Sequence, residues 1–321
     1  MDALAGLLAG PRAQGAFLLR SVFDPPWSVR IQDEAPLTVL APVRGEVWVT
    51  PDGEHEGKDH GENGRAAAVL LRPGDLAITR GPRPYTVADR PGRPPRVVVH
   101  PGQRSTTPEG AELCAEMDLG VRAWGDGPAG STVLLSGTYQ LRGEVSGRLL
   151  RALPVLLVLP GEEWSSPLIP LLDEEIGRQG PGQEVVLDRL LDLLLSSALR
   201  AWFARPEARA PGWYRAQGDP VLGRALELLH TEPAAPWTVA GLAAAVGVSR
   251  AALARRFTGC VGEPPMAYLT GLRLALAADL LREPDATLAA VARQVGYGSA
   301  FALSAAFKRV NGVSPQQFRG A

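Results

Sequence analysis

Cysteine is scarce in this sequence, and long uncharged apolar runs are missing. Only two cysteines occur among 321 residues, Cys114 and Cys260, and they fall in different predicted domains. A disulfide framework is therefore excluded in practice, and the pair is typical of a reducing cytoplasm. The longest apolar helical stretch, residues 185–203, carries four charged side chains, and residues 1–10 lack the charged start and long apolar core of a signal peptide. We expect a cytoplasmic protein without a membrane span.

Net charge is also small, but it is unevenly distributed along the chain. The formal net charge is −1 at pH 7. Residues 218–321 hold 10 basic and 7 acidic side chains, whereas residues 1–217 hold 23 and 27. A surplus this modest suits nucleic-acid binding mainly where the basic side chains cluster. Such clusters occur at Arg250, Arg255 and Arg256 and at Lys308 and Arg309.

Two similar helical hairpins are predicted in the C-terminal third. Each begins with a short alanine-rich helix that ends at a glycine, Gly247 or Gly296, and a serine then caps a second helix. This is a helix-turn-helix pattern. Apolar residues at helical spacing predict how each unit packs: Leu242, Val246, Leu253 and Phe257 in the first, and Leu288, Val291, Val295, Leu303 and Phe307 in the second. A helix over residues 265–282, roughly 27 Å long, would hold the two units about one turn of DNA apart.

This segment resembles the DNA-binding domain of the AraC family of bacterial transcription regulators. The resemblance covers about 100 residues and rests mainly on residues 261–269, which are similar to the junction between the family's two units, and residues 295–319, which are similar to its C-terminal signature. It implies double-stranded promoter DNA as a partner, RNA polymerase as a second partner, and action as a homodimer.

The second helix of each hairpin keeps its core residues inward, so its opposite face is predicted to meet DNA. The predicted DNA-binding residues are Ser249, Arg250, Ala251, Ala254, Arg255 and Arg256 in the first unit, and Ser299, Ala300, Phe301, Ser304, Ala305, Lys308 and Arg309 in the second. Arginine can form a bidentate contact to guanine, whereas alanine and phenylalanine can only touch thymine methyl groups or fill space. We therefore expect Arg255 to be the main base reader, with Lys308 and Arg309 holding phosphates. The alternative is that Arg255 also contacts only phosphate.

The N-terminal half is predicted to be rich in β-structure. Short β-prone runs separated by Gly/Pro turns extend from Ala16 to about Leu159, which is typical of an antiparallel sandwich or barrel. Four stretches are similar to the cupin-like sensor domain found ahead of AraC-type DNA-binding domains: residues 15–20, 25–30, 72–76 and 149–154. We predict an α+β protein of two domains: a cupin-like β-barrel with trailing helices over residues 1–205, a linker over 206–218, and an all-α domain with two helix-turn-helix units over 219–321.

Histidine is nearly absent from the predicted strands, which bears on metal binding. Cupin enzymes hold a metal through histidines on strands that correspond here to residues 37–48 and 75–87, and these stretches contain none. We expect no cofactor, no metal, no catalytic residues and no enzymatic activity. A small-molecule effector would lie beside Trp27, Trp48 and Tyr85, which are equally well explained as core side chains. His55 and His60 lie in a glycine-rich loop that favours a solvated hairpin tip over a metal site.

A broad apolar face marks the predicted helix over residues 185–203. A face this wide must be covered, either by its own barrel or by the same helix of a second subunit. We favour dimerisation, through Leu187, Leu191, Leu194, Leu195 and Trp202.

The sequence thus predicts a transcription regulator that responds to a small molecule. One alternative is a thiol-based redox or electrophile switch, although Cys114 has acidic neighbours that disfavour a thiolate and Cys260 suits a packed position. Another is an enzyme, either a cupin oxygenase or an alkyl-accepting repair protein fused to an AraC-like domain. The missing histidines weigh against the first enzyme, and the lack of a clustered cysteine site weighs against the second.

Overall fold

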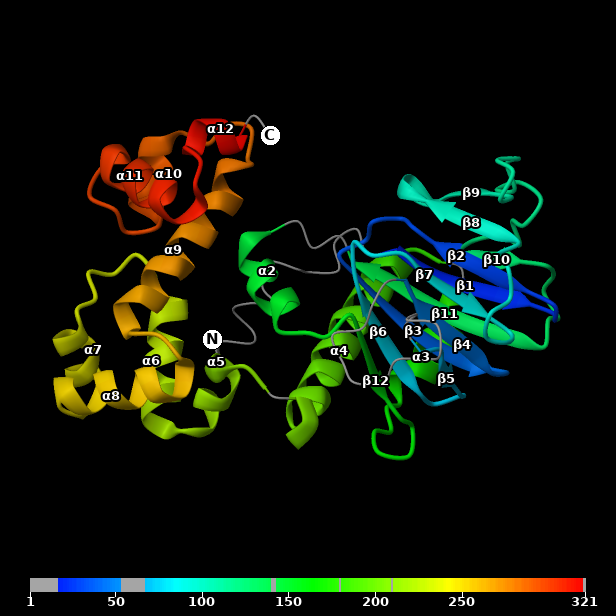
Figure 1. Ribbon diagram of the computed structural model, residues 1–321, viewed down its shortest axis with the longest axis horizontal. Coiled ribbons are helices and arrows are strands. Elements are labelled where there is room, and N and C mark those ends of the chain that lie inside the picture. Colours follow the sequence, from blue (N-terminus) through cyan, green and yellow to red (C-terminus); the bar gives the residue numbers. More distant parts are fainter. Residues whose placement is uncertain (1–16, 53–66, 140–142, 179, 209, 320–321) are drawn as a thin grey trace. The chain divides into compact units, whose positions relative to one another are not determined.

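The computed structural model describes residues 17–52, 67–139, 143–178, 180–208 and 210–319 (Figure 1). They form two compact units. Residues 17–139 and 153–202 make up the first, which we call the β unit, and residues 143–152 and 203–319 make up the second, the helical unit. Each unit is therefore assembled from two separate segments of the chain.

The described strands of the β unit form two six-stranded sheets, as expected for a cupin-like fold. In spatial order the first sheet contains β10 (Ala123–Gly125), β1 (Phe17–Phe23), β11 (Thr132–Tyr139), β3 (Leu37–Arg44), β6 (Leu76–Arg80) and β12 (Leu156–Leu159). The second contains β5 (Val69–Leu71), β4 (Val47–Pro51), β7 (Tyr85–Ala88), β2 (Ser28–Ile31), β8 (Val97–His100) and β9 (Arg104–Thr106). A short 3₁₀ helix, η1 (Pro101–Gln103), joins β8 to β9.

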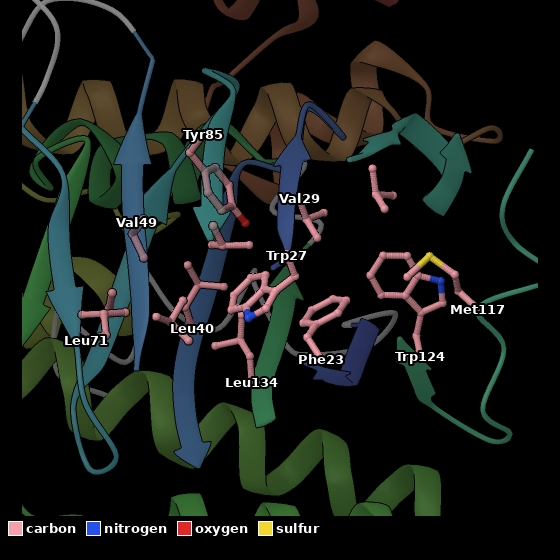
Figure 2. Close-up of a cluster of buried hydrophobic side chains, with 14 residues drawn as sticks. Phe23, Trp27, Val29, Leu40, Val49, Leu71, Tyr85, Met117, Trp124 and Leu134 are labelled. Carbon is pink, nitrogen blue, oxygen red and sulfur yellow. The ribbon is translucent and has the colours of Figure 1, made fainter. Parts of the chain in front are cut away.

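An apolar core lies between these sheets, because each strand turns alternate side chains inward. On β4, Val47 and Val49 are buried in this core, whereas Trp48 between them is only half-buried. Figure 2 shows Phe23 and Trp27 side by side in the cluster; their rings stack with centroids 4.7 Å apart. Trp124 meets Phe23 edge-on at 5.5 Å.

Two helices complete the β unit, α3 (Leu168–Ile176) and α4 (Gln183–Phe203). The apolar face of α4 packs on its own sheet. The Tyr139 hydroxyl on β11 donates a 2.7 Å hydrogen bond to the Leu191 carbonyl, and Gly137 leaves the space that the Leu191 side chain fills. Leu187, Leu191, Leu194 and Leu195 are buried within a single chain and Trp202 is half-buried, so the prediction that this stripe meets a second subunit is corrected. None of the described helices is long and apolar enough to cross a bilayer.

The helical unit contains the two predicted hairpins. Its helices are α2 (Glu144–Arg151), α5 (Gly212–Arg215), α6 (Pro220–Thr231), α7 (Val239–Ala245), α8 (Arg250–Val261), α9 (Pro265–Leu281), α10 (Leu288–Gln294), α11 (Ala300–Asn311) and α12 (Pro315–Arg319). Two 3₁₀ helices, η2 (Pro206–Ala208) and η3 (Ala216–Gly218), flank α5.

The predicted linker over residues 206–218 is wrong in its second half. Ala216 is fully buried in the core of the first hairpin, and Trp213 packs against the same core. A Cβ on Gly212 would lie 2.4 Å from the Cys260 carbonyl oxygen, so α5 approaches α8 closely. The proline and glycine residues that suggested a linker instead shape a folded start to the helical unit.

Candidate nucleic-acid interface and sensor cavity

The two hairpins are built as near copies. In the second helix of each, a serine side chain caps the N-terminus: Ser249 accepts from the Ala252 N–H at 3.2 Å, and Ser299 accepts from the Ala302 N–H at 3.1 Å. Gly262 and Gly312 end these helices in the left-handed conformation, with φ of 93° and 76°. Capping of this kind fixes where α8 and α11 begin and end, and so which side chains each presents outward.

The outward face of α8 carries arginine. Leu253 and Phe257 are fully buried in the core of the first hairpin, and Arg255 lies on the opposite side of the helix. Arg250 and Arg255 are exposed, and neither has an ion pair among the described residues. Both guanidinium groups are therefore exposed, and their contact with DNA stays a prediction.

Arg256 differs from its two neighbours because it is engaged within the chain. Its Nη2 donates to Asp219 Oδ2 at 2.6 Å, and Asp219 also caps α6 by accepting from the backbone N–H of Val221 at 2.9 Å. Burial favours a higher pKa for Asp219, but the hydrogen bonds from Leu222, Arg256 and Val221 outweigh it and hold the pKa below its ordinary value. The sequence indicated Arg256 for DNA binding and missed this structural pairing.

The outward face of α11 is apolar at its start and basic at its end. Phe301 is 83% exposed, whereas Leu303 and Phe307 are fully buried. Lys308 and Arg309 are exposed in the last turns of the helix. The predicted second-unit residues thus lie on one side of α11, with Ala300 and Ser304 half-buried beside them.

Helix α9 connects the two hairpins and contributes to both cores. Tyr268 and Leu269, near its start, belong to the first core, whereas Leu274 and Leu281 belong to the second. Its 17 residues span about 25 Å at ~1.5 Å per residue. The Arg273 side chain donates to the carbonyls of Pro233 and Ala235, which ties the loop after α6 to this helix.

Helix α2, which follows β11 in the chain, docks on α9. Asp279 accepts hydrogen bonds from the first backbone N–H groups of α2: Glu144 N to Oδ1 at 2.7 Å and Val145 N to Oδ2 at 3.3 Å. A carboxylate suits this position because the N-terminus of a helix carries partial positive charge. Burial nevertheless raises the pKa of Asp279, and the two N–H donors only partly offset it.

A second contact joins the middle of α2 to the start of α9. The Arg148 guanidinium lies 4.9 Å from the centre of the Tyr268 ring, and its Nη2 is 3.6 Å from Glu263 Oε1. A Cβ on Gly271 would lie 2.6 Å from the same Nη2, so the glycine makes room for the guanidinium. Together with Asp279, these residues hold α2 along much of the length of α9.

Comparisons with known proteins agree with this architecture. A cupin family model matches residues 2–204, and a helix-turn-helix domain model matches residues 242–321. Over 326 aligned residues the chain is 31% identical to a Streptomyces lividans protein that carries the name AraC-like transcription regulator; the match spans 99% of this chain and 98% of that protein. The chain is an AraC-type transcription regulator.

Other relatives match parts of the regulator. The HTH-type transcriptional regulator AlkR of Acinetobacter baylyi is 35% identical over 177 residues, which are 53% of this chain and 58% of that protein. The solved DNA-binding domain of AdpA in complex with a target DNA is 30% identical and covers 32% of this chain and 91% of that chain, with a TM-score of 0.31.

The β unit of the regulator contains two adjoining cavities. The inner one, about 50 Å³, is lined by Tyr85 and by Ser136 and Thr138 of β11. The outer one, about 260 Å³, is lined by Cys114, Arg122 and other residues. Five side chains line both cavities: Phe17, Leu19, Val99, Gln103 and Trp124. The two cavities therefore form one path into the interior of the β unit.

Of the three residues predicted to contact an effector, Tyr85 alone lines one of these two cavities. Tyr85 lines the inner cavity, where burial raises the pKa of its phenol well above the ordinary value. Trp27 lies in the core and lines another cavity, of about 560 Å³, which shares Phe23 and Val29 with the inner cavity. Trp48 lies on the outer face of β4, because the inward positions of that strand are taken by Val47 and Val49.

The sequence analysis missed most of the cavity lining. Ser136 and Thr138 alternate with Gly137 and Tyr139 along β11, so the two small polar residues face the cavity while the other two face α4. Small hydroxyl side chains at the inward positions of a strand were the available signal. Trp124 lies on a strand that the sequence analysis did not predict.

The remaining predicted sites lie apart from this path or at its edge. Cys114 is exposed at the outer cavity, and its Sγ accepts from the Ser105 N–H at 3.2 Å. Cys260 is half-buried and packs against the first hairpin core. Within the part of the chain that the structure describes, no cluster of histidine, cysteine and carboxylate side chains is arranged to hold a metal. His55 and His60 lie outside the described residues.

Proposed function

We propose that this regulator binds a small, largely apolar molecule in the β unit and transmits its presence to the DNA-binding helices through α2. One observation carries the proposal. Ser136 and Thr138 of β11 line the inner cavity, and the next helix in the chain after β11 is α2, which begins at Glu144. In the chain, therefore, few residues separate a strand of the cavity wall from a helix that is docked in the helical unit.

The cavity suits a small ligand. An apolar cavity of about 150 Å³ can hold one benzene ring, so the outer cavity of about 260 Å³ fits a molecule of one or two rings. Leu19, Val99 and Trp124 would supply apolar contact. The hydroxyls of Tyr85 and Ser136 would orient a single polar group deeper inside.

A ligand changes DNA binding only if it favours one arrangement of the protein over another. A molecule that displaces β11 would shift α2, and α2 holds α9 at Asp279 and beside Tyr268. The second helices of the two hairpins, α8 and α11, which we call the recognition helices, both pack on α9. A small change in α2 would therefore alter the spacing or tilt of α8 and α11, which must match successive major grooves.

The outward side chains of the recognition helices support a division of labour on DNA. We assign direct base reading mainly to Arg255, which lies opposite the buried face of α8, and phosphate contacts to Lys308 and Arg309. Homodimerisation and contact with RNA polymerase remain expectations from the family. The stripe of α4 that contains Leu191 is buried against β11 and is therefore not the surface that we propose for a second subunit.

The test combines a probe with two variants. 6-Propionyl-2-(dimethylamino)naphthalene, a neutral two-ring dye whose emission shifts in apolar surroundings, should bind the purified full-length protein. Ser136→Leu, which fills the inner cavity where the polar group of the ligand would lie, should weaken dye binding and also change the affinity for a selected DNA site. Thr86→Leu is the matched control, since Thr86 lies between the inward side chains of β7. Ser136→Leu that still binds the dye equally well would contradict the cavity assignment.

The role of α2 has its own test. Asp279→Ala removes both hydrogen bonds to the N-terminus of α2, and Asp279→Asn keeps one acceptor. We expect the change in DNA affinity caused by Ser136→Leu, on the order of 5–150-fold for a typical coupling, to disappear in the Asp279→Ala background and to persist in part in the Asp279→Asn background. Full persistence in both backgrounds would refute transmission through α2.

One observation favours a second candidate function, electrophile sensing. The Cys114 thiol is exposed, lines the outer cavity and accepts a hydrogen bond from the Ser105 N–H. N-ethylmaleimide should add to Cys114: the sulfur bonds to one carbon of the C=C double bond, which becomes a single bond, and the thiol proton passes to the other carbon. The addition should change DNA affinity, and Cys114→Ser should prevent both effects. Labelling of Cys114 that leaves DNA binding unchanged would exclude this candidate.

A further inference from the structure

Phe301 is the most exposed large apolar side chain in the described part of the chain. It is 83% exposed, ahead of Val185 at 61% and Val310 at 55%. It is the second residue of α11, directly after the capped N-terminus. A phenyl ring that is this exposed can bury apolar surface against a partner, which is favourable.

The outward side chains next to Phe301 on α11 are short. The next residues on that face are Ser304 and Ala305, one turn further along the helix, and Lys308 follows after another turn. Serine and alanine are too short to reach as far as the phenyl ring. The first two turns of α11 therefore present one apolar side chain and no long hydrogen-bonding side chain.

The matching face of α8 has the opposite arrangement. Counted from the capping serines, Phe301 matches Ala251, and Ala305 matches Arg255. Each recognition helix thus carries one large and one small residue at these two outward positions, but in exchanged order. The two helices therefore present different chemistry to a partner. The second turn of α8 presents a charged donor, and the first turn of α11 presents an apolar surface.

We propose that Phe301 is a specificity-determining residue that contacts the C5 methyl group of a thymine in the major groove. The inference rests on the assignment of α11 as a recognition helix under the proposed function. The N-terminal residues of such a helix contact base edges, and the thymine methyl is the apolar group that a base pair displays in the major groove. Lys308 and Arg309 on the same helix favour DNA over an apolar protein surface.

Deoxyuridine supplies a test that removes only the methyl group. After DNA fragments have been selected with the full-length protein, each thymine of the site is replaced in turn by deoxyuridine. We expect about fourfold weaker binding at one or two positions in the half read by α11, which is the effect of losing one buried methyl. Cytosine at such a position should bind more tightly when it is replaced by 5-methylcytosine.

The Phe301→Ala variant assigns the effect to this side chain. The variant should fold with unchanged stability because the ring is exposed, and it should bind thymine and deoxyuridine equally well at those positions. Phe301→Leu should keep part of the discrimination, and Arg255→Ala should keep all of it.

Three results would overturn the proposal. The first is equal deoxyuridine sensitivity in the wild type and in Phe301→Ala, which would leave the rest of the DNA interface standing. The second is a Phe301→Ala variant that binds every DNA as the wild type does but loses transcription activity, which would assign the ring to a protein partner. The third is a wild type that selects no DNA sequence, which would refute the proposed function as well.

Discussion

The contact between Gly137 and Leu191 can be tested by exchanging volume across it. A Cβ added to Gly137 would lie 2.8 Å from Leu191 Cδ2, whereas every other neighbour is at least 3.9 Å away. Gly137→Ala should therefore overpack only this contact and lower the free energy of unfolding by about 1–3 kcal/mol. Leu191 is 1% exposed, so Leu191→Ala should cost about 2–5 kcal/mol through lost burial and the space left behind.

The double variant distinguishes this contact from a general loss of stability. In Gly137→Ala/Leu191→Ala, the new methyl group at position 137 enters the space that Leu191 vacates. The combined loss should then be smaller than the sum of the two single losses by roughly 1–2 kcal/mol, which is a typical coupling for residues in contact. Urea unfolding of the full-length protein, followed by tryptophan fluorescence, measures all three variants on one scale.

Two results would refute the packing of α4 on β11. One is strict additivity, because residues without contact do not couple. The other is a Leu191→Ala protein that keeps its stability but changes from dimer to monomer in sedimentation, since this would place Leu191 against a second subunit. Neither is expected, given the hydrogen bond from the Tyr139 hydroxyl to the Leu191 carbonyl.

Three further predictions concern the helical unit. Arg255→Ala should weaken binding to the selected DNA by about 1–3 kcal/mol and relax preference at one or two base pairs, whereas titrations that show the same loss on all sequences would make Arg255 a phosphate contact. Lys308→Ala should weaken all sequences alike and lower the slope of log Kd against log salt by about one, as measured at several salt concentrations. The pKa of Asp219 is lowered in the folded protein, so its contribution to stability is present above the unfolded value of 3.8 and is lost as the pH falls through the folded value. The urea concentration at the unfolding midpoint should therefore decrease less between neutral and acidic pH in Arg256→Ala than in the wild type. An equal decrease in both proteins would argue against the ion pair between Arg256 and Asp219.

The helical hairpins were predictable from the sequence because their signals are local. Leu253 and Phe257 repeat at helical spacing, and in each unit a left-handed glycine follows the first helix and a serine caps the second. These rules depend on neighbouring residues only. The structure agrees with the predicted core positions in both hairpins.

Features that depend on distant partners were not predictable in the same way. The apolar stripe of α4 shows that Leu191 must be covered, but not whether β11 or another subunit covers it. Docking of α2 depends on Asp279, which lies 135 residues after Glu144 in the chain. The position of Trp48 depended on strand register, since a shift by one residue would have turned its side chain inward.

The placement of α2 has a consequence for how such regulators can be recombined. A DNA-binding fragment that begins near residue 203 would lack α2, and it would leave Tyr268 and Asp279 without their partners. A chimaera that joins this sensor to an unrelated helix-turn-helix domain would carry α2 with no surface to receive it. Exchange of domains between related regulators should therefore succeed only when the β unit, α2 and α9 come from the same parent. A cut within residues 206–218 would separate α2 from α9.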